Sequence, residues 1–206
     1  MAEAALYAFV AFLVILDPPG TAAIFAAMTA GDTAAEKRQQ AIRATVISFV
    51  VLVGFAVAGG LLLRALGIGL PAMKVAGGLL LFLAAADMVM GSTLLRATPA
   101  EKEAATRTRE DISVFPLAIP LIAGPGAMTT IVLLAEQAAG DWLRLAAVLL
   151  AMTAALLVTL GAMLGAARLA RLLGETGAHV IGRVLGVVLA ALAAQIVLDG
   201  IRQSFA

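Results

Sequence analysis

Two uncharged apolar runs, each as long as a membrane crossing, constrain this chain most. The first is the 20 residues between Arg43 and Arg64, and the second is the 23 residues between Arg144 and Arg168. A helix needs roughly 20 mostly apolar residues to cross about 30 Å of hydrocarbon. The 206-residue chain is 63% hydrophobic and only 13% charged, whereas about a quarter of the residues in a soluble domain are charged. We therefore expect an all-α membrane protein.

Two further apolar stretches are interrupted by proline and glycine. Ala4–Met28 is broken at Asp17-Pro18-Pro19-Gly20, and Ile112–Ala135 contains two prolines before Gly124-Pro125-Gly126. Proline removes a backbone donor and clashes with the preceding turn, so a mid-span break frees N–H and C=O groups that lipid cannot satisfy. We expect two discontinuous helices whose freed groups are satisfied by protein, water or a bound solute.

Two more stretches, 71–91 and 179–201, carry a charge near each end and complete a set of six predicted spans. Asp87 and Asp199 lie near the ends of these spans, which favours solvated carboxylates at the membrane interface. Polar connections are expected at 29–43, 64–70, 92–113, 136–144 and 166–178. In 29–43, Asp32 or Thr33 is expected to cap the following helix, with Glu36 completing a capping box with Thr33.

Lysine and arginine are distributed unevenly between the two sides of the predicted bundle. The connections between spans 1 and 2, 3 and 4, and 5 and 6 hold ten of the 14 basic residues. Basic residues are retained on the cytoplasmic side. The distribution predicts a multi-pass protein of the cytoplasmic membrane with both termini outside. It forms a single transmembrane domain over 1–206, with three helices in 1–91, a cytoplasmic connection at 92–113 and three helices in 114–206.

The order of the spans repeats: broken, continuous, charge-bracketed, and then the same again. Two sets of landmarks recur at matching spacings: Lys74, Gly77 and Gly91 with Arg183, Gly186 and Gly200, and Pro19-Gly20 with Pro125-Gly126. Three spans are an odd number, so the second copy enters the membrane upside down. Many secondary transporters are built from such inverted repeats, with the substrate held where the matching spans are discontinuous.

The two breaks are therefore the predicted substrate-binding site. Helix N-termini suit a carboxylate and helix C-termini suit a cation, so opposed breaks could hold a small zwitterion such as an amino acid. The candidate residues are Asp17, Pro18, Gly20, Thr21, Gly124, Pro125, Gly126, Thr129 and Thr130.

Asp17 is the carboxylate that is hardest to explain as surface. A charged residue in mid-span costs at least roughly 2.5–3.5 kcal/mol, so Asp17 should face the bundle interior. It is a candidate proton-coupling residue, and the alternative is that it only caps the helix beginning at Pro18 or Pro19. For each nearby threonine, the alternative to ligand binding is a hydrogen bond to a carbonyl one turn earlier.

The chain lacks the residues that several other functions need. It has no Cys, one His and a formal net charge of +1, which argues against disulfides, a metal centre and nucleic-acid binding. It contains no Gly-x-Ser-x-Gly elbow, no paired His and no clustered carboxylates at span depth, so we expect no enzymatic activity. We expect no metal and no cofactor. The expected partners are the lipid bilayer and a small zwitterionic amino acid.

Three segments resemble the MarC family of integral membrane proteins, which includes SnatA-type transporters of small neutral amino acids. They are Pro71-Ala-Met-Lys-Val-Ala-Gly-Gly-Leu-Leu-Leu-Phe82, Phe115-Pro-Leu-Ala-Ile-Pro-Leu-Ile-Ala-Gly-Pro-Gly-Ala127 and Asp17-Pro-Pro-Gly20. The resemblance also extends to the ending Ala194–Ile201 and covers nearly the whole chain.

The resemblance implies six spans in two inverted halves, with the broken first and fourth helices meeting at the substrate. It also implies proton-coupled transport of glycine, alanine and similar amino acids. The residues carried over are Asp17, Pro18, Gly20, Gly124, Pro125 and Gly126. Thr21 and Ala23 depart from the Asn and second Pro of many relatives, so side-chain contacts from this half are not carried over.

Other functions stay open at this point. The chain could be a channel or exporter for another small solute, or a membrane protein with no transport activity of its own. A channel would normally show a ring of like charges or a repeated filter. The sequence leaves open the exact substrate, the direction of transport, the coupling ion and the oligomeric state.

Overall fold

The computed structural model describes residues 2–90 and 112–205, and within these ranges the chain is helical with short connections and no strand. Gly91 and all but the last two residues of the predicted connection 92–113 lie outside the described residues. The elements are α1 (Ala2–Leu16), α2 (Pro18–Met28), α3 (Ala34–Ala65), α4 (Leu70–Met90), η1 (Ser113–Ile122), α6 (Pro125–Gln137), α7 (Trp142–Leu164) and α8 (Ala166–Ser204).

The described part of the chain contains five helical stretches long and apolar enough to cross a membrane, or six if the bent pair of η1 and α6 counts as one span. The stretch Glu3–Met28, which joins α1 and α2, counts as one of the five. The predicted all-α membrane class is confirmed. The predicted six spans correspond to the higher of the two counts, in which η1 and α6 form one span.

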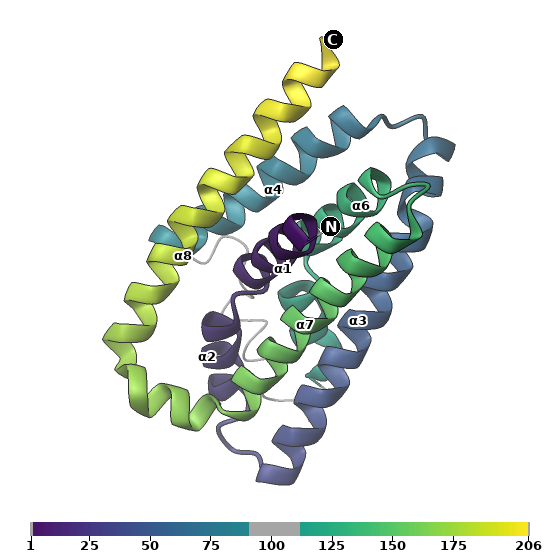
Figure 1. Ribbon diagram of the computed structural model, residues 1–206. Coiled ribbons are helices and arrows are strands. Elements are labelled where there is room, and N and C mark those ends of the chain that lie inside the picture. The colour runs from purple at the N-terminus through teal and green to yellow at the C-terminus, as the bar shows by residue number, and fades with distance from the viewer. Residues whose placement is uncertain (1, 91–111, 206) are drawn as a thin grey trace.

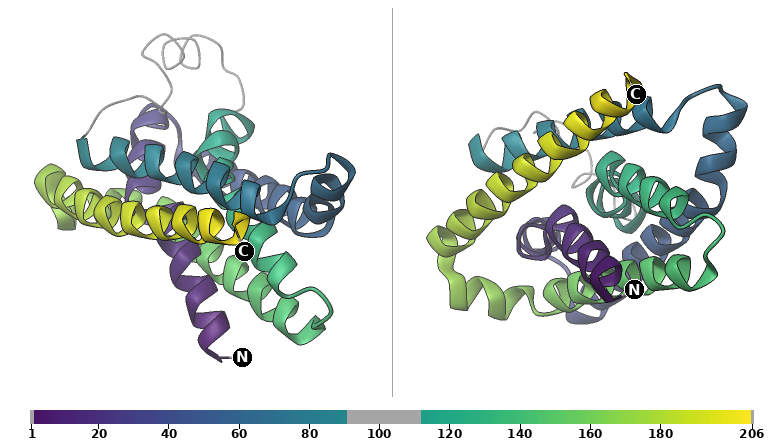
Figure 2. Two further views of the ribbon diagram at one scale, coloured as in Figure 1. Left: turned by 90° about the horizontal axis from the view of Figure 1, so that it is seen from above. Right: turned by 45° about the horizontal axis from the view of Figure 1, so that its top comes forward.

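The interrupted segments occupy the centre of the molecule. Figures 1 and 2 show α1 and α6 inside a ring formed by α3, α4, α7 and α8. The most apolar window of Glu3–Met28 is 56% buried inside the protein, against 22–39% for the other four candidate spans, and the six residues Thr129–Leu134 of α6 are all buried. The outer helices instead expose large apolar side chains, such as Val50, Leu150 and Val187. The central position gives the broken segments a protein environment in place of lipid.

Glycines let the outer helices approach closely. α4 and α8 lie side by side and antiparallel (Figure 2). Gly78 of α4 packs on the backbone of Ala193 and Val197, and Gly200 of α8 packs on Pro71 and Lys74. Small residues allow such contact between membrane helices, because the backbones can come within van der Waals distance.

α3 begins earlier than predicted. The connection 29–43 is helical from Ala34 onward, because Thr33 and Glu36 form the expected capping box and strong helix formers come next. The Glu36 carboxylate accepts a hydrogen bond from the Thr33 N–H at 2.8 Å. At 32 residues, α3 is about 48 Å long. It is longer than the hydrocarbon is thick, so its first turns extend beyond it.

The connection predicted at 166–178 is also helical. The backbone of α8 is helical from Ala166 to Ser204, since Ala, Leu and Arg all favour helix. Hydropathy located the apolar part correctly, because the candidate span in α8 is Val180–Ser204. The connections predicted at 64–70 and 136–144 are present but shorter: residues 66–69 and 138–141 join helices, with left-handed glycines at Gly67 and Gly140.

The prediction of a solvated Asp87 is wrong. Asp87 is only 3% exposed. The other buried residues of α4 are Gly77, Gly78, Leu81 and Ala85. Leu81 and Ala85 pack with Leu189 and Ala193 of α8. The position of a residue near the end of a span therefore does not determine its exposure. Asp199 is half-exposed and accepts a hydrogen bond from Gln195 at 2.9 Å.

Candidate functional site

The first interruption is a single residue in the left-handed conformation. Asp17 has φ 42° and ψ 68° and separates α1 from α2. This conformation is unfavourable for residues other than glycine, although Asp and Asn tolerate it best. Asp17 caps α2, because its carboxylate accepts a hydrogen bond from the Gly20 N–H at 3.1 Å. Its carboxylate also lies where a Cβ on residue 20 would have to be, which explains the glycine.

Hydrogen bonds within the first break satisfy two of its backbone carbonyls. The Thr21 hydroxyl, which is 2% exposed, donates to the Leu16 carbonyl at 2.7 Å, and the Thr21 N–H donates to the Asp17 carbonyl at 2.8 Å. Pro18 is buried as the first residue of α2, where its missing N–H costs nothing. Asp17 therefore acts as a helix cap, and the Thr21 hydroxyl is bonded to a backbone carbonyl, as the two alternatives to ligand binding predicted.

The second interruption is longer. η1 is irregular, with cis peptide bonds before Pro116 and Pro120 and extended backbone at Phe115 and Ile119. η1 and α6 are bent by 57° relative to each other. Gly124 precedes α6 in an extended conformation (φ −77°, ψ 173°), with the exposed Pro125 as the first helical residue. The N-cap residue of α6, Gly124, makes no side-chain cap hydrogen bond, in contrast to Asp17 at α2.

Close contacts bring the two interrupted segments together. A Cβ on Gly126 would collide with the Leu81 side chain and would lie 3.7 Å from Cγ2 of Ile15, which is two residues before Asp17. A Cβ on Gly124 would lie 2.5 Å from the Pro120 carbonyl oxygen. The first turn of α6 therefore packs beside the last turn of α1, with glycine at both tight positions.

The two threonines of α6 have different environments. Thr129, 4% exposed, packs its side chain directly on Gly77 of α4. Thr130 is 6% exposed, and its hydroxyl oxygen has no hydrogen-bond partner in the structure. A buried hydroxyl without a partner costs free energy unless water or a ligand satisfies it. Thr130 is thus a polar group available in the protein interior one turn beyond the start of α6.

The predicted site residues form two groups with different electrostatics. Around α2, the carboxylate of Asp17 already occupies the helix N-terminus. Around α6, the N-terminal N–H groups carry partial positive charge, and the N-cap residue Gly124 makes no side-chain cap hydrogen bond. The small buried residues Ala22, Ala123 and Ala127 lie in the same segments. Chemically, the Asp17 carboxylate suits a cation and the N-terminus of α6 suits an anion.

The sequence did not predict an ion pair at the far end of α6. Glu136 was assigned to a polar connection, but its side chain lies over Gly60 of α3 and is 3.6 Å from Arg64. Gly59 likewise accommodates Val132. The adjacent glycines within an otherwise continuous span were the signal for close helix packing.

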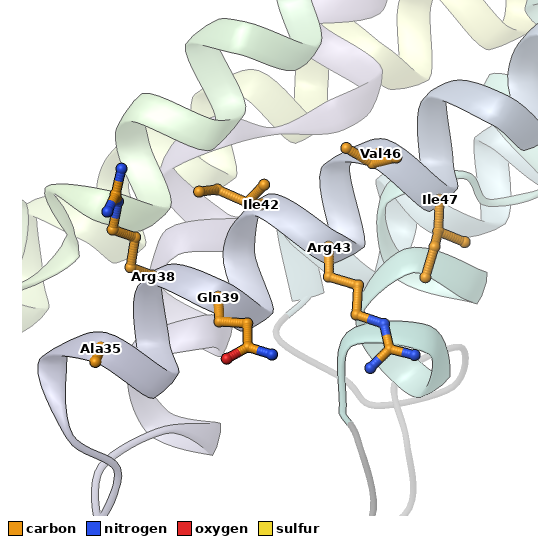
Figure 3. Close-up of a pocket in the computed structure, with 7 residues that line it drawn as sticks. All are labelled: Ala35, Arg38, Gln39, Ile42, Arg43, Val46 and Ile47. Carbon is orange, nitrogen blue, oxygen red and sulfur yellow. The ribbon is translucent and has the colours of Figure 1, made fainter.

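A pocket of about 520 Å³ lies away from both breaks, along one face of α3 (Figure 3). Its lining residues are Ala35, Arg38, Gln39, Ile42, Arg43, Val46 and Ile47. Within residues 2–90 and 112–205, no three His, Cys, Asp or Glu side chains cluster closely enough to hold a metal ion.

Comparison with known proteins matches residues 2–205 to the family described as MarC family integral membrane protein. The chain belongs to the MarC family. A "UPF0056 membrane protein" of Archaeoglobus fulgidus is 36% identical over 95% of this chain and 91% of the relative. "UPF0056 membrane protein YvbG" of Bacillus subtilis is 31% identical over 97% of this chain and 94% of the relative.

The name of a third relative specifies the membrane in which that protein lies. "UPF0056 inner membrane protein YhgN" of Escherichia coli is 32% identical over 95% of this chain and 94% of that protein. No solved structure matches the chain. The names of these relatives describe membrane proteins and give no activity, so membership of the family establishes an integral membrane protein.

Proposed function

We propose that this MarC-family chain is a proton-coupled secondary transporter of small neutral amino acids such as glycine and alanine. The observation that carries the proposal is the difference between two helix starts in the middle of the protein. α2 begins under the carboxylate of Asp17, whereas α6 begins with no side-chain cap. The proposal assigns no enzymatic step, and it leaves the direction of transport undetermined.

The electrostatics suit a zwitterion. The carboxylate of an amino acid would accept hydrogen bonds from the N–H groups at the start of α6, as anions do at helix N-termini. The ammonium group of the amino acid would lie toward Asp17. The Thr130 hydroxyl, which has no partner in the structure, would form a hydrogen bond with the ligand. Pro120 packs closely on Gly124, and Leu81 packs closely on Gly126. This close packing at the start of α6 favours glycine and alanine over larger amino acids.

The packing supports an inverted repeat of 1–91 and 114–206. α1 and α2 pack on α7, while η1 and α6 pack on α3, and exchanging the halves maps one set of contacts onto the other. α4 and α8 pack on each other, which is the contact that a two-fold exchange preserves. In this arrangement the breaks in the first and fourth spans lie at equivalent positions, where inverted-repeat transporters bind their substrates.

The charge distribution supports the orientation. With the N-terminal part of α3, residues 92–113 and the N-terminal part of α8 on the cytoplasmic side, most basic residues are retained there, and both termini are then expected outside. Alternating access would then move the two interrupted segments relative to the outer helices and open the site to each side in turn.

The proposal is tested by flux. Purified protein in proteoliposomes is expected to take up labelled glycine and alanine with saturable kinetics, and a proton gradient is expected to raise accumulation above equilibrium. Liposomes without protein provide the control. Flux that rises linearly with concentration would indicate a channel instead. No glycine or alanine movement under any proton gradient would overturn the proposal.

A further inference from the structure

The side chain of Leu81 lies against the helix start at which the proposed substrate binds. Leu81 extends from α4 and is 1% exposed. Its Cδ2 atom occupies the place that a Cβ on Gly126 would need, and its Cγ atom would be 3.1 Å from that Cβ. We propose that Leu81 is the residue that limits the size of the amino-acid side chain this protein transports. The inference rests on the proposed function and assigns its size limit to one residue.

Two contacts fix the position of Leu81 along α6. The Thr129 side chain packs on Gly77 of α4, and one turn later on α4 the Leu81 side chain packs on Gly126. Residues three or four apart share one face of a helix, so these two contacts join one face of α4 to one face of α6. The two helices run antiparallel through this contact. Leu81 therefore lies at the first turn of α6 and not along its middle.

Leu81 contacts a residue that supplies an N–H group at the start of α6. Pro125 has no N–H, and the Met128 N–H already donates to the carbonyl before the helix at 3.0 Å. The N–H groups of Gly126 and Ala127 come between them and are the donors that a carboxylate at this helix start would meet. The side chain of an amino acid branches from the carbon that carries the carboxylate. A substrate held by these donors would therefore bring its side chain within reach of Leu81.

Leu81 is closer to this point than the neighbouring apolar residue of α1. The Cγ2 atom of Ile15 would lie 3.7 Å from a Cβ on Gly126, which is ordinary van der Waals contact, whereas Leu81 leaves no room for that atom. Leu81 also belongs to a buried cluster with Val14 of α1 and Leu189 of α8. Because protein interiors are closely packed, this cluster restrains the side chain from turning away from α6.

The test is the ratio of valine transport to alanine transport in proteoliposomes, measured as kcat/KM for each amino acid. Wild type is expected to prefer alanine. Leu81→Ala removes the side chain beyond Cβ and is expected to raise the ratio at least about tenfold, since one methylene in an apolar pocket changes discrimination about 10–200-fold. Leu81→Met conserves the volume and is expected to keep the wild-type ratio. Leu81→Val, a smaller truncation, is expected to shift the ratio in the same direction by less, and it serves if Leu81→Ala does not fold.

A second substitution tests the contact itself. In the Leu81→Ala background, Gly126→Ala places a Cβ where the Leu81 Cδ2 atom lies in wild type. This double variant refills part of the vacated space and is expected to lose part of the gain in valine transport. Leu63→Ala is the matched control, because Leu63 is buried in α3 one turn after Gly59, which packs on Val132 beyond the first turns of α6. The control is expected to keep the wild-type ratio.

An unchanged ratio in a Leu81→Ala variant that still transports alanine would overturn the inference and leave the transport proposal intact. An equal gain of valine transport in the Leu63 variant would also overturn it, because a general loosening of the fold would then explain the change. If wild type moves neither amino acid, the proposed function fails, and the inference fails with it.

Discussion

In the Asp17→Asn variant, proton-driven accumulation of alanine is expected to fall to background, while exchange of alanine across the membrane continues in part. Asparagine caps helices about as well as aspartate, so its side-chain oxygen can keep the hydrogen bond from the Gly20 N–H. It also tolerates the left-handed conformation of residue 17. What asparagine cannot do is take up and release a proton. The measurement is uptake and counterflow in the same proteoliposome preparation.

Asp141→Asn is the matched control for this experiment. Asp141 also caps a helix, since its carboxylate accepts a hydrogen bond from the Arg144 N–H at 3.0 Å, but it is exposed and lies before the span of α7. The same chemical change there is expected to leave accumulation unchanged. If Asp17→Asn accumulates alanine as wild type does, Asp17 acts only as a helix cap and the proton site lies elsewhere.

Gly124→Ala is expected to destabilise the protein by about 1–3 kcal/mol, the usual cost of overpacking, and to reduce transport strongly. The new Cβ would lie 2.5 Å from the Pro120 carbonyl oxygen. Because that atom belongs to the backbone, relief requires η1 to move relative to α6. The movement would displace the start of α6, which is the proposed anion site. Unfolding of the purified protein in detergent measures the stability, and alanine uptake measures the function.

The control is Gly161→Ala in α7, where a Cβ would meet nothing within 4 Å. Alanine in a helix interior is favoured over glycine by roughly 0.5–1 kcal/mol, so this variant should be as stable as wild type or slightly more stable. Equal stability of the Gly124 and Gly161 variants would mean that the contact with Pro120 does not constrain the second break.

Features determined by charge and by local hydrogen bonding could be predicted from the sequence. Arg43, Arg64 and Arg144 marked the apolar runs because lipid excludes charge, and Thr33 with Glu36 marked the start of α3 because a capping box is a local interaction. The carbonyl-bonding alternative for Thr21 is likewise local. Both hydrogen-bonded features depend only on residues within a few positions of one another.

Burial could not be predicted in the same way. Residues facing lipid and residues facing the protein centre are equally apolar in a membrane protein, so hydropathy did not separate the central α6 from the outer α7. Asp87 is buried although it lies near the end of its span, and Thr129 of α6 packs on Gly77 of α4, which is distant in sequence. The uncapped start of α6 depends on which side chains surround it in the fold, and proline and glycine spacing alone does not give that.

The most direct test of the proposed substrate site uses a single introduced thiol. The chain has no Cys, so in Thr130→Cys a small thiol reagent can react at one place only, when the site opens to water. Alanine is expected to slow modification of this variant in proteoliposomes. It should leave Thr45→Cys unaffected, since Thr45 is buried in α3 and bonded to the Ala41 carbonyl. If alanine does not slow modification at residue 130 in a variant that still transports alanine, the substrate does not bind between the two breaks.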